Sequence, residues 1–173
     1  MNSTLHLPPS PQVIMSEGER NVPGTEASSN EKLLFLRENM VHLTNQLSMP
    51  IIEVALVVSK YIRVVLDSLQ KAATEEGEEL PKILLNPLPS DSSLSETTSG
   101  IDSFPLEKLI ERVDHDRMDI LDTLVRTILN ESQLEFVSAL REFRDWEFEI
   151  RKQLSEVSTP GGLFSPLSLD DDF

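Results

Sequence analysis

The side chains with the richest chemistry are four acids and an imidazole crowded into one short stretch. They are Asp114, His115, Asp116, Asp119 and Asp122, and their oxygen and nitrogen atoms are of the kind that ligate divalent metals. Their spacing matches no metal-binding motif, because no glycine supplies the turn of a calcium loop and the acids point in different directions around a helix. We interpret them as a solvated acidic face and expect no metal site.

No other set of residues in the sequence suggests catalysis. His6 lies in a Pro- and Ser-rich terminal stretch, and His42 has no carboxylate or serine at an offset typical of a catalytic triad. The chain has no cysteine, and its 6 glycines form no phosphate-binding loop. We predict a protein that is not an enzyme and that uses neither a cofactor nor a small-molecule substrate.

The charge of the chain limits the classes of partner that we expect it to bind. The formal net charge is −15, of which −6 lies in residues 72–103 and −4 in residues 156–173. Direct binding to nucleic acid needs clustered Lys and Arg, so we do not expect it. Glu53, Lys60 and Arg63 interrupt the main apolar run, which argues against a membrane span, and no signal peptide is recognisable. We expect protein partners and a location inside the cell, in the cytoplasm or the nucleus.

Composition divides the chain into five parts. Residues 1–27 and 158–173 are predicted to be disordered tails, and residues 74–102 an acidic, Pro- and Ser-rich linker, because such segments bury too little apolar surface to offset the entropy of ordering. Helical patterns occupy residues 28–73 and 103–157. Within the linker, the apolar island Ile83-Leu84-Leu85 either packs locally or stays mobile.

The first helical region is predicted to begin at Ser28, which forms a capping box with Glu31. Apolar residues then follow at a spacing typical of a short coiled-coil seam. They are Leu33, Leu36, Met40, Leu43 and Leu47. Pro50 lacks an amide donor, so we expect a kink near residues 48–50, or a restart of the helix with Ser48 as its N-cap.

The pattern from Met49 to Leu66 is apolar over an arc of roughly 200° around the helix. A helix that packs on one neighbour shows an arc of only about 100° or somewhat more, so this helix must be covered by two or more elements. The rest of the chain offers few, which predicts helical association with a partner protein or a second copy. The contact residues expected here are Val54, Val57, Tyr61 and Val64.

The second helical region carries two apolar stripes that do not align on one helical wheel. Arg117 intrudes on the first stripe, and a second capping box, Ser132 with Glu135, lies at the junction of the two. We therefore expect a break near residues 130–132. The second stripe contains Phe143 and Trp146, expected at a second interface.

Phe148 lies off that second stripe. It should remain exposed unless another surface covers it, so it is the best single candidate for a partner contact.

The last residues interleave apolar side chains with acids and prolines. They resemble acidic activation segments and also the peptide motifs read by trafficking adaptors, and they form either a docking motif or an inert tail. Phe164, Leu167 and Phe173 would carry the docking. Candidate phosphorylation sites are Ser10, Thr159 and Ser165, each of which precedes a proline, and Ser168, which has Asp171 three residues on.

The sequence thus predicts an all-α protein whose long bent helices form an antiparallel helical hairpin or coiled-coil-like bundle. Its predicted role is that of a structural adaptor subunit in an intracellular multiprotein complex, with helical partners or with copies of itself. The alternative is a transcriptional regulator with a helical dimerisation region and an acidic activation tail.

Overall fold

The structure of the chain is a computed structural model that describes residues 21–89 and 106–173. Its elements are α1 (Ser29–Gln46), α2 (Ile51–Glu75), α3 (Lys82–Leu85), α4 (Leu106–Arg112), α5 (His115–Ser132), α6 (Phe136–Ser155) and a 3-10 turn, η1 (Pro160–Phe164). Within those two ranges there is no strand, only an isolated bridge between Pro50 and Pro166. The prediction of a mainly helical protein is confirmed.

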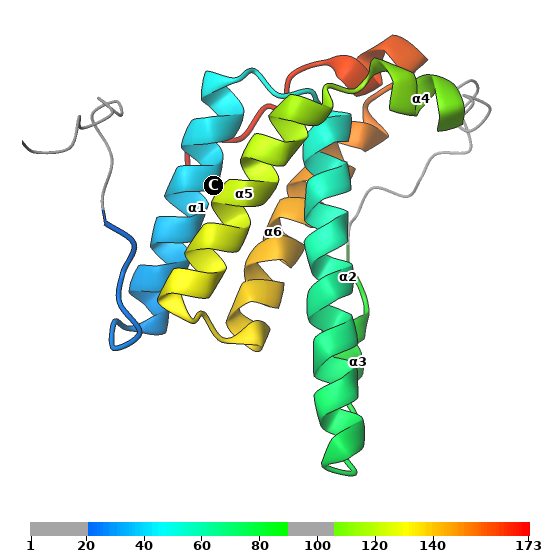
Figure 1. The fold of residues 1–173 in the computed structure, drawn as a ribbon. Helices are drawn as coiled ribbons and strands as arrows, with labels where there is room; N and C mark the ends of the chain where they lie inside the picture. Colours follow the sequence, from blue (N-terminus) through cyan, green and yellow to red (C-terminus); the bar gives the residue numbers. More distant parts are fainter. Residues whose placement is uncertain (1–20, 90–105) are drawn as a thin grey trace, which may run out of the picture.

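Four helices, α1, α2, α5 and α6, lie side by side in a bundle (Figure 1). α1 and α6 run in one direction and α2 and α5 in the other, with α1 and α2 on opposite sides. The most extensive contacts join α2 to α6, α1 packs against α5 and α6, and α2 also packs against α5. The two halves of the chain are therefore interleaved. This arrangement does not confirm the expected hairpin of two bent helices with a coiled-coil seam.

The chain reverses completely between α1 and α2 instead of kinking. The start of α1 is as predicted, since the Ser28 hydroxyl accepts a hydrogen bond from the Glu31 amide at 3.2 Å. At its end, Ser48 adopts a left-handed conformation with φ 46°, and Pro50 occupies the N-cap of α2. Ser48 is thus not the cap of the second helix. The left-handed residue followed by a proline without an amide donor turns the chain back along the bundle.

A second reversal lies between α5 and α6. Gln133 ends α5 in a left-handed conformation with φ 51°, and α6 starts after Glu135. The prediction that Ser132 caps α6 is wrong. This residue remains inside α5, where its hydroxyl donates to the Ile128 carbonyl at 2.6 Å.

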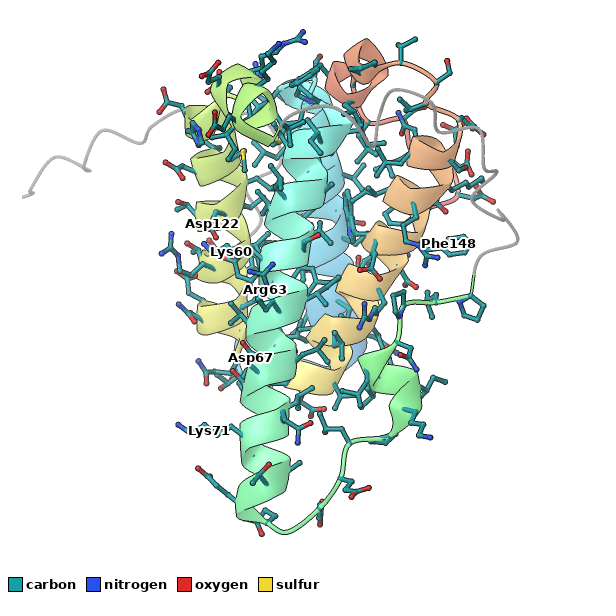
Figure 2. The ribbon with its side chains drawn as sticks, turned by 90° about the vertical axis from the view of Figure 1, so that its right-hand side faces the viewer. Lys60, Arg63, Asp67, Lys71, Asp122 and Phe148 are labelled. Carbon is teal, nitrogen blue, oxygen red and sulfur yellow. The ribbon has the colours of Figure 1, made fainter. Side chains whose placement is uncertain are left out.

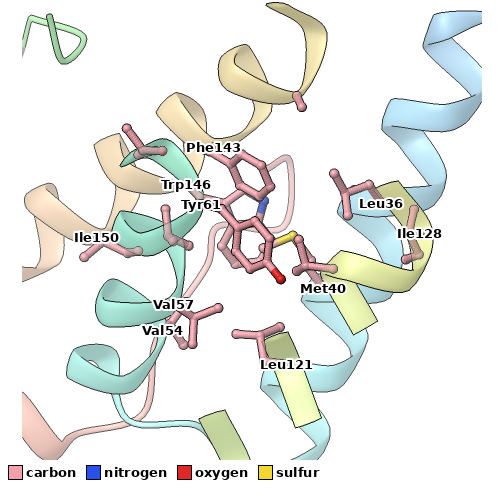
Figure 3. Packing of buried hydrophobic residues seen from close by; sticks show 14 of the residues in the cluster. Leu36, Met40, Val54, Val57, Tyr61, Leu121, Ile128, Phe143, Trp146 and Ile150 are labelled. Carbon is pink, nitrogen blue, oxygen red and sulfur yellow. The ribbon is translucent and has the colours of Figure 1, made fainter. Parts of the chain in front are cut away.

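The core lies where the four long helices meet (Figure 3). It includes the fully buried Leu36 and Met40 of α1, Leu121 of α5, and Phe143 of α6. The wide arc of α2 is covered by α5, α6 and η1, so two or more elements do bury it, as its width required. These neighbours belong to the same chain, whereas the sequence pattern suggested that another chain would have to supply them.

The described part of the expected linker packs on α6. Two arginines of α6 donate to main-chain oxygens: Arg144 Nη2 to Leu84 and Leu85 at 3.3 and 3.2 Å, and Arg151 Nη1 to Leu88 at 2.7 Å. Leu84 is partly buried against the core. Within the apolar island, Leu84 therefore packs locally, which was one of the two alternatives, whereas Ile83 and Leu85 remain exposed.

The C-terminal segment also differs from the expected disordered tail. The Leu167 amide donates to the Met49 carbonyl at 2.9 Å, and the Ile51 amide donates to the Ser165 carbonyl at 2.8 Å. Leu163 and Leu167 are buried. The physical reason is that the first amides of α2 need acceptors from outside the helix, and the tail supplies one while its leucines cover the turn between α1 and α2.

Candidate interaction surface

The acidic stretch of α5 has structural partners. Asp114 caps the helix, accepting from the amides of Asp116 and Arg117 at 3.0 and 3.2 Å. His42 and His115 are exposed on different helices, and His6 lies outside the described residues. Within residues 21–89 and 106–173, no group of three or more His, Cys, Asp or Glu side chains is placed to hold a metal ion.

Asp122 links α5 to α2. Its carboxylate accepts from Lys60 Nζ at 2.8 Å and from the Tyr61 hydroxyl, which also donates to the Asp122 carbonyl at 2.9 Å. Burial and this hydrogen bond raise the pKa of Tyr61 above its ordinary value. Burial alone would raise the pKa of Asp122, but the hydrogen bonds from Lys60 and Tyr61 outweigh it and lower that pKa below the ordinary value.

An ion pair to a buried carboxylate makes a second link between the same helices. Arg117 donates from Nε to Glu53 Oε1 at 2.9 Å and from Nη2 to Glu53 Oε2 at 2.8 Å. The hydrogen bond to Glu53 raises the pKa of Arg117 further. Glu53 is fully buried, although it is one of the charges that interrupt the apolar run of the sequence. Arg117 interrupts an apolar stripe because it has this partner.

The residues expected to contact partners through α2 fall into two groups. Val54, Val57 and Tyr61 are buried in the core of the same chain (Figure 3). Val64 is 49% exposed. It stands alone among charged side chains, because Lys60, Arg63, Asp67 and Lys71 follow one another along the outer face of α2 (Figure 2). A single exposed valine in such a setting is ordinary surface.

The aromatic residues of α6 also divide between core and surface. Phe143 and Trp146 are fully buried. Phe143 stacks on Tyr61 with the ring centroids 5.6 Å apart. Phe148 is only partly buried and points outward from α6 (Figure 2). Of the three, it alone reaches the surface.

The tail aromatics contact the bundle. Phe173 packs edge-on against Trp146 at a centroid distance of 5.1 Å, beneath the Arg37 guanidinium at 4.6 Å, and Phe164 lies 4.1 Å from the Arg112 guanidinium. The hydroxyls proposed for phosphorylation on Thr159, Ser165 and Ser168 belong to exposed residues, and Ser10 lies outside the described ranges.

One surface was not anticipated: two hollows that flank α6 and share lining residues. Its first hollow, of about 420 Å³, lies between α6 and residues 82–89, and is lined by Ile83, Leu84, Leu88, Leu140, Arg141, Arg144 and Asp145. Its second hollow, of about 350 Å³, lies between α6 and α1, and is lined by Leu33, Leu34, Arg37, Arg141, Glu142 and Asp145. Arg141 and Asp145 line both hollows. We call the two together the α6 groove.

The walls of the α6 groove combine exposed apolar side chains with charged ones. Ile83 is 78% exposed and Leu34 is 56% exposed. A third hollow, of about 260 Å³, adjoins the groove through Arg37 and Asp145 and includes Phe148 and Phe173. The outward position of Phe148 was the part of this surface that the sequence signalled.

Some charged side chains along the groove have hydrogen-bond partners for their polar atoms, and others do not. Arg37 donates to Glu142 at 2.7 Å and to Asp145 at 2.7 Å, and the hydrogen bond to Glu142 raises the pKa of Arg37. Arg141 is exposed and makes no hydrogen bond or ion pair with any residue that the structure describes. Arg144 is buried, yet its Nε has no acceptor among those residues. Such a buried donor costs about 1–3 kcal/mol while it stays unpaired.

No known family, curated protein or solved structure matches this chain. In the described part of the chain, no helix combines the length and apolarity that a bilayer crossing requires.

Proposed function

We propose that this chain is a non-enzymatic adaptor subunit of an intracellular complex and that it holds a partner protein in the α6 groove. The observation that carries the proposal is the open, apolar groove beside the highly exposed Ile83, in a protein whose other long apolar arc is covered by its own chain. Exposed apolar side chains rimmed by charged ones are found at interaction sites.

The dimensions of the groove support a peptide or a loop as its occupant. Each hollow falls within the range of roughly 300–1,000 Å³ that ligand pockets show. Because the hollows share Arg141 and Asp145, one extended segment could lie across both. The C-terminal segment is a weaker basis for partner binding, because a partner would first have to displace Leu163, Leu167 and Phe173 from the bundle.

Site-specific cross-linking in cells tests the proposal. A photoreactive amino acid replaces Ile83 in the full chain, and in a matched control it replaces Val64, which is also exposed but belongs to the charged face of α2. We expect a discrete cross-linked species from position 83 that is lost when Arg141→Glu is added, and none from position 64. Equal labelling at both positions, or none at position 83, would contradict the proposal.

Light scattering separates a partner protein from a second copy. We expect the purified chain to keep the mass of a monomer over a tenfold range of concentration. A dimer that dissociates in the Ile83→Asp variant would show that the groove binds another copy of this chain, and the adaptor proposal would then fail.

A further inference from the structure

We propose that the α6 groove recognises an acidic, apolar peptide segment. In this proposal a carboxylate of the peptide binds beside Arg141 and Arg144, and a neighbouring leucine or phenylalanine fills the hollow between Ile83 and Leu88. The inference rests on the proposed function and adds the chemistry of the partner segment.

The first observation is that one side-chain donor of Arg144 has no hydrogen-bond acceptor. Its side chain is only 7% exposed and lines the first hollow. Nη1 donates to Glu147 at 2.8 Å and Nη2 donates to the main chain at Leu84 and Leu85, but Nε has no acceptor among the described residues. Because Nε is itself sealed from solvent, the guanidinium acts on a ligand in the hollow as a fixed positive charge in its wall and not as an open donor.

The second observation is the uncompensated charge at Arg141. This side chain lines both hollows and has no charged partner in the described part of the chain. The nearby carboxylates of Glu142 and Asp145 are already bound to Arg37. Those two carboxylates share a single guanidinium, but the lining of the first hollow holds two arginines, Arg141 and Arg144, against one acid, Asp145. An incoming carboxylate therefore meets a net positive charge there, which repels a lysine-rich peptide.

The third observation is that the rest of the first hollow is apolar. Ile83, Leu84, Leu88 and Leu140 form its walls. A ligand that carried charge alone would leave the exposed side chain of Ile83 in water. A segment with a large apolar side chain next to its acid satisfies both parts of the hollow, because burial of the apolar group adds to the charged hydrogen bonds.

Three fluorescent peptides test this chemistry against the full chain. The first contains the sequence Asp-Leu-Asp-Phe-Asp, the second has Asn in place of each Asp, and the third has Lys. We expect fluorescence anisotropy to show that the acidic peptide binds about tenfold more tightly than the Asn peptide, and that the Lys peptide does not bind. In NMR spectra, the Nε–H signal of Arg144 should shift with the acidic peptide and stay in place with the other two.

Two groove variants and two matched controls assign the binding to this site. Arg141→Gln should weaken the acidic peptide about tenfold, and Ile83→Asp should abolish its binding. Arg63→Gln and Val64→Asp make the same changes on the outer face of α2 and should leave the affinity unchanged. All four positions are exposed, so circular dichroism should show the same helicity throughout.

The outcomes separate this inference from the proposed function. If the Asn peptide binds as tightly as the acidic one, if Arg141→Gln has no effect, or if no peptide binds while the cross-link at position 83 persists, acid recognition is wrong and the adaptor role stands. If the cross-link at position 83 is also absent, both are wrong.

Discussion

The α2 side and the α6 side of the bundle use apolar surface in opposite ways. On the α2 side, Val54 and Val57 are covered by other helices of the same chain, and the buried polar group of Glu53 has a partner. On the α6 side, Ile83 is exposed, Arg141 is unpaired within the described residues, and a buried nitrogen lacks an acceptor. One side is closed by its own chain, and the other is left open.

The difference teaches that the width of an apolar arc and the need for a partner are separate properties. The roughly 200° arc of α2 indicated how many neighbours the helix needs, and the fold supplies them internally. The open groove lies instead along α6, beside a stripe whose Phe143 and Trp146 were expected at an interface and are buried in the core. It forms because residues 82–89 lie against the helix without filling the space beside it.

The largest effect on stability is expected when a carboxylate is introduced on the α2 side, and the same change on the α6 side serves as the comparison. Val54→Asp places a carboxylate at a fully buried position with no partner, so we expect a loss of about 4 kcal/mol or more in the free energy of unfolding, or failure to fold. Ile83→Asp, at a position that is 78% exposed, should change it by no more than about 0.5 kcal/mol. Urea denaturation measures both, and similar losses would mean that the α6 side is closed as well.

A smaller effect is expected when the ion pair of the closed side is broken. Arg117→Met leaves the buried Glu53 carboxylate without its guanidinium, which should cost about 3 kcal/mol. Adding Glu53→Leu removes the stranded charge and should restore most of that loss. If the double variant is no more stable than the single one, Glu53 is not the reason for the loss.

Phe173 tests how firmly the tail closes the end of the bundle. Phe173→Ala removes the edge-on contact with Trp146 and should lower the free energy of unfolding by about 1–2 kcal/mol. Trp146 is the sole tryptophan, so its emission should shift to longer wavelength as water reaches the ring. The exposed Ser168→Ala serves as the control. Unchanged emission in Phe173→Ala would show that the tail contact contributes nothing to burying the indole.

The smallest effect is a pH dependence at the link between α2 and α5. Because the folded pKa of Asp122 is lowered, its contribution to stability is complete above the ordinary value of 3.8 and is lost as the pH falls through the folded value. The stability difference between the wild type and Asp122→Asn should therefore be constant near neutral pH and shrink in acid. Urea denaturation over a series of pH values tests this, and a difference that grows in acid would contradict it.

Local patterns predicted local structure well. Ser28 was expected to cap a helix and does so, because capping depends on residues only a few positions apart. The breaks near residues 48–50 and 130–132 were expected, but their extent was not. Proline and polar residues signal that a helix ends, whereas the left-handed residues Ser48 and Gln133 that turn the chain back carry no glycine signal.

Long-range pairing explains the remaining corrections. Glu53 looked like a surface acid and Arg117 like an intruder on an apolar stripe, because their partner positions are 64 residues apart in the chain. Residues 158–173 looked disordered because, taken by themselves, they bury too little apolar surface to offset the entropy of ordering. This segment is ordered on the bundle because its backbone hydrogen-bonds to the turn between α1 and α2, which no local pattern reveals.

The sequence by itself determined that the described chain is mainly helical, where its first long helix begins and that Phe148 faces away from the core. These properties depend on periodicity and on short-range hydrogen bonds, which are written in neighbouring residues. Only the tertiary structure decided that α2 is closed by its own chain, that the tail packs on the bundle and that α6 carries the open groove. Those properties depend on which surfaces meet, and a helix pattern specifies how much surface must be covered but not what covers it.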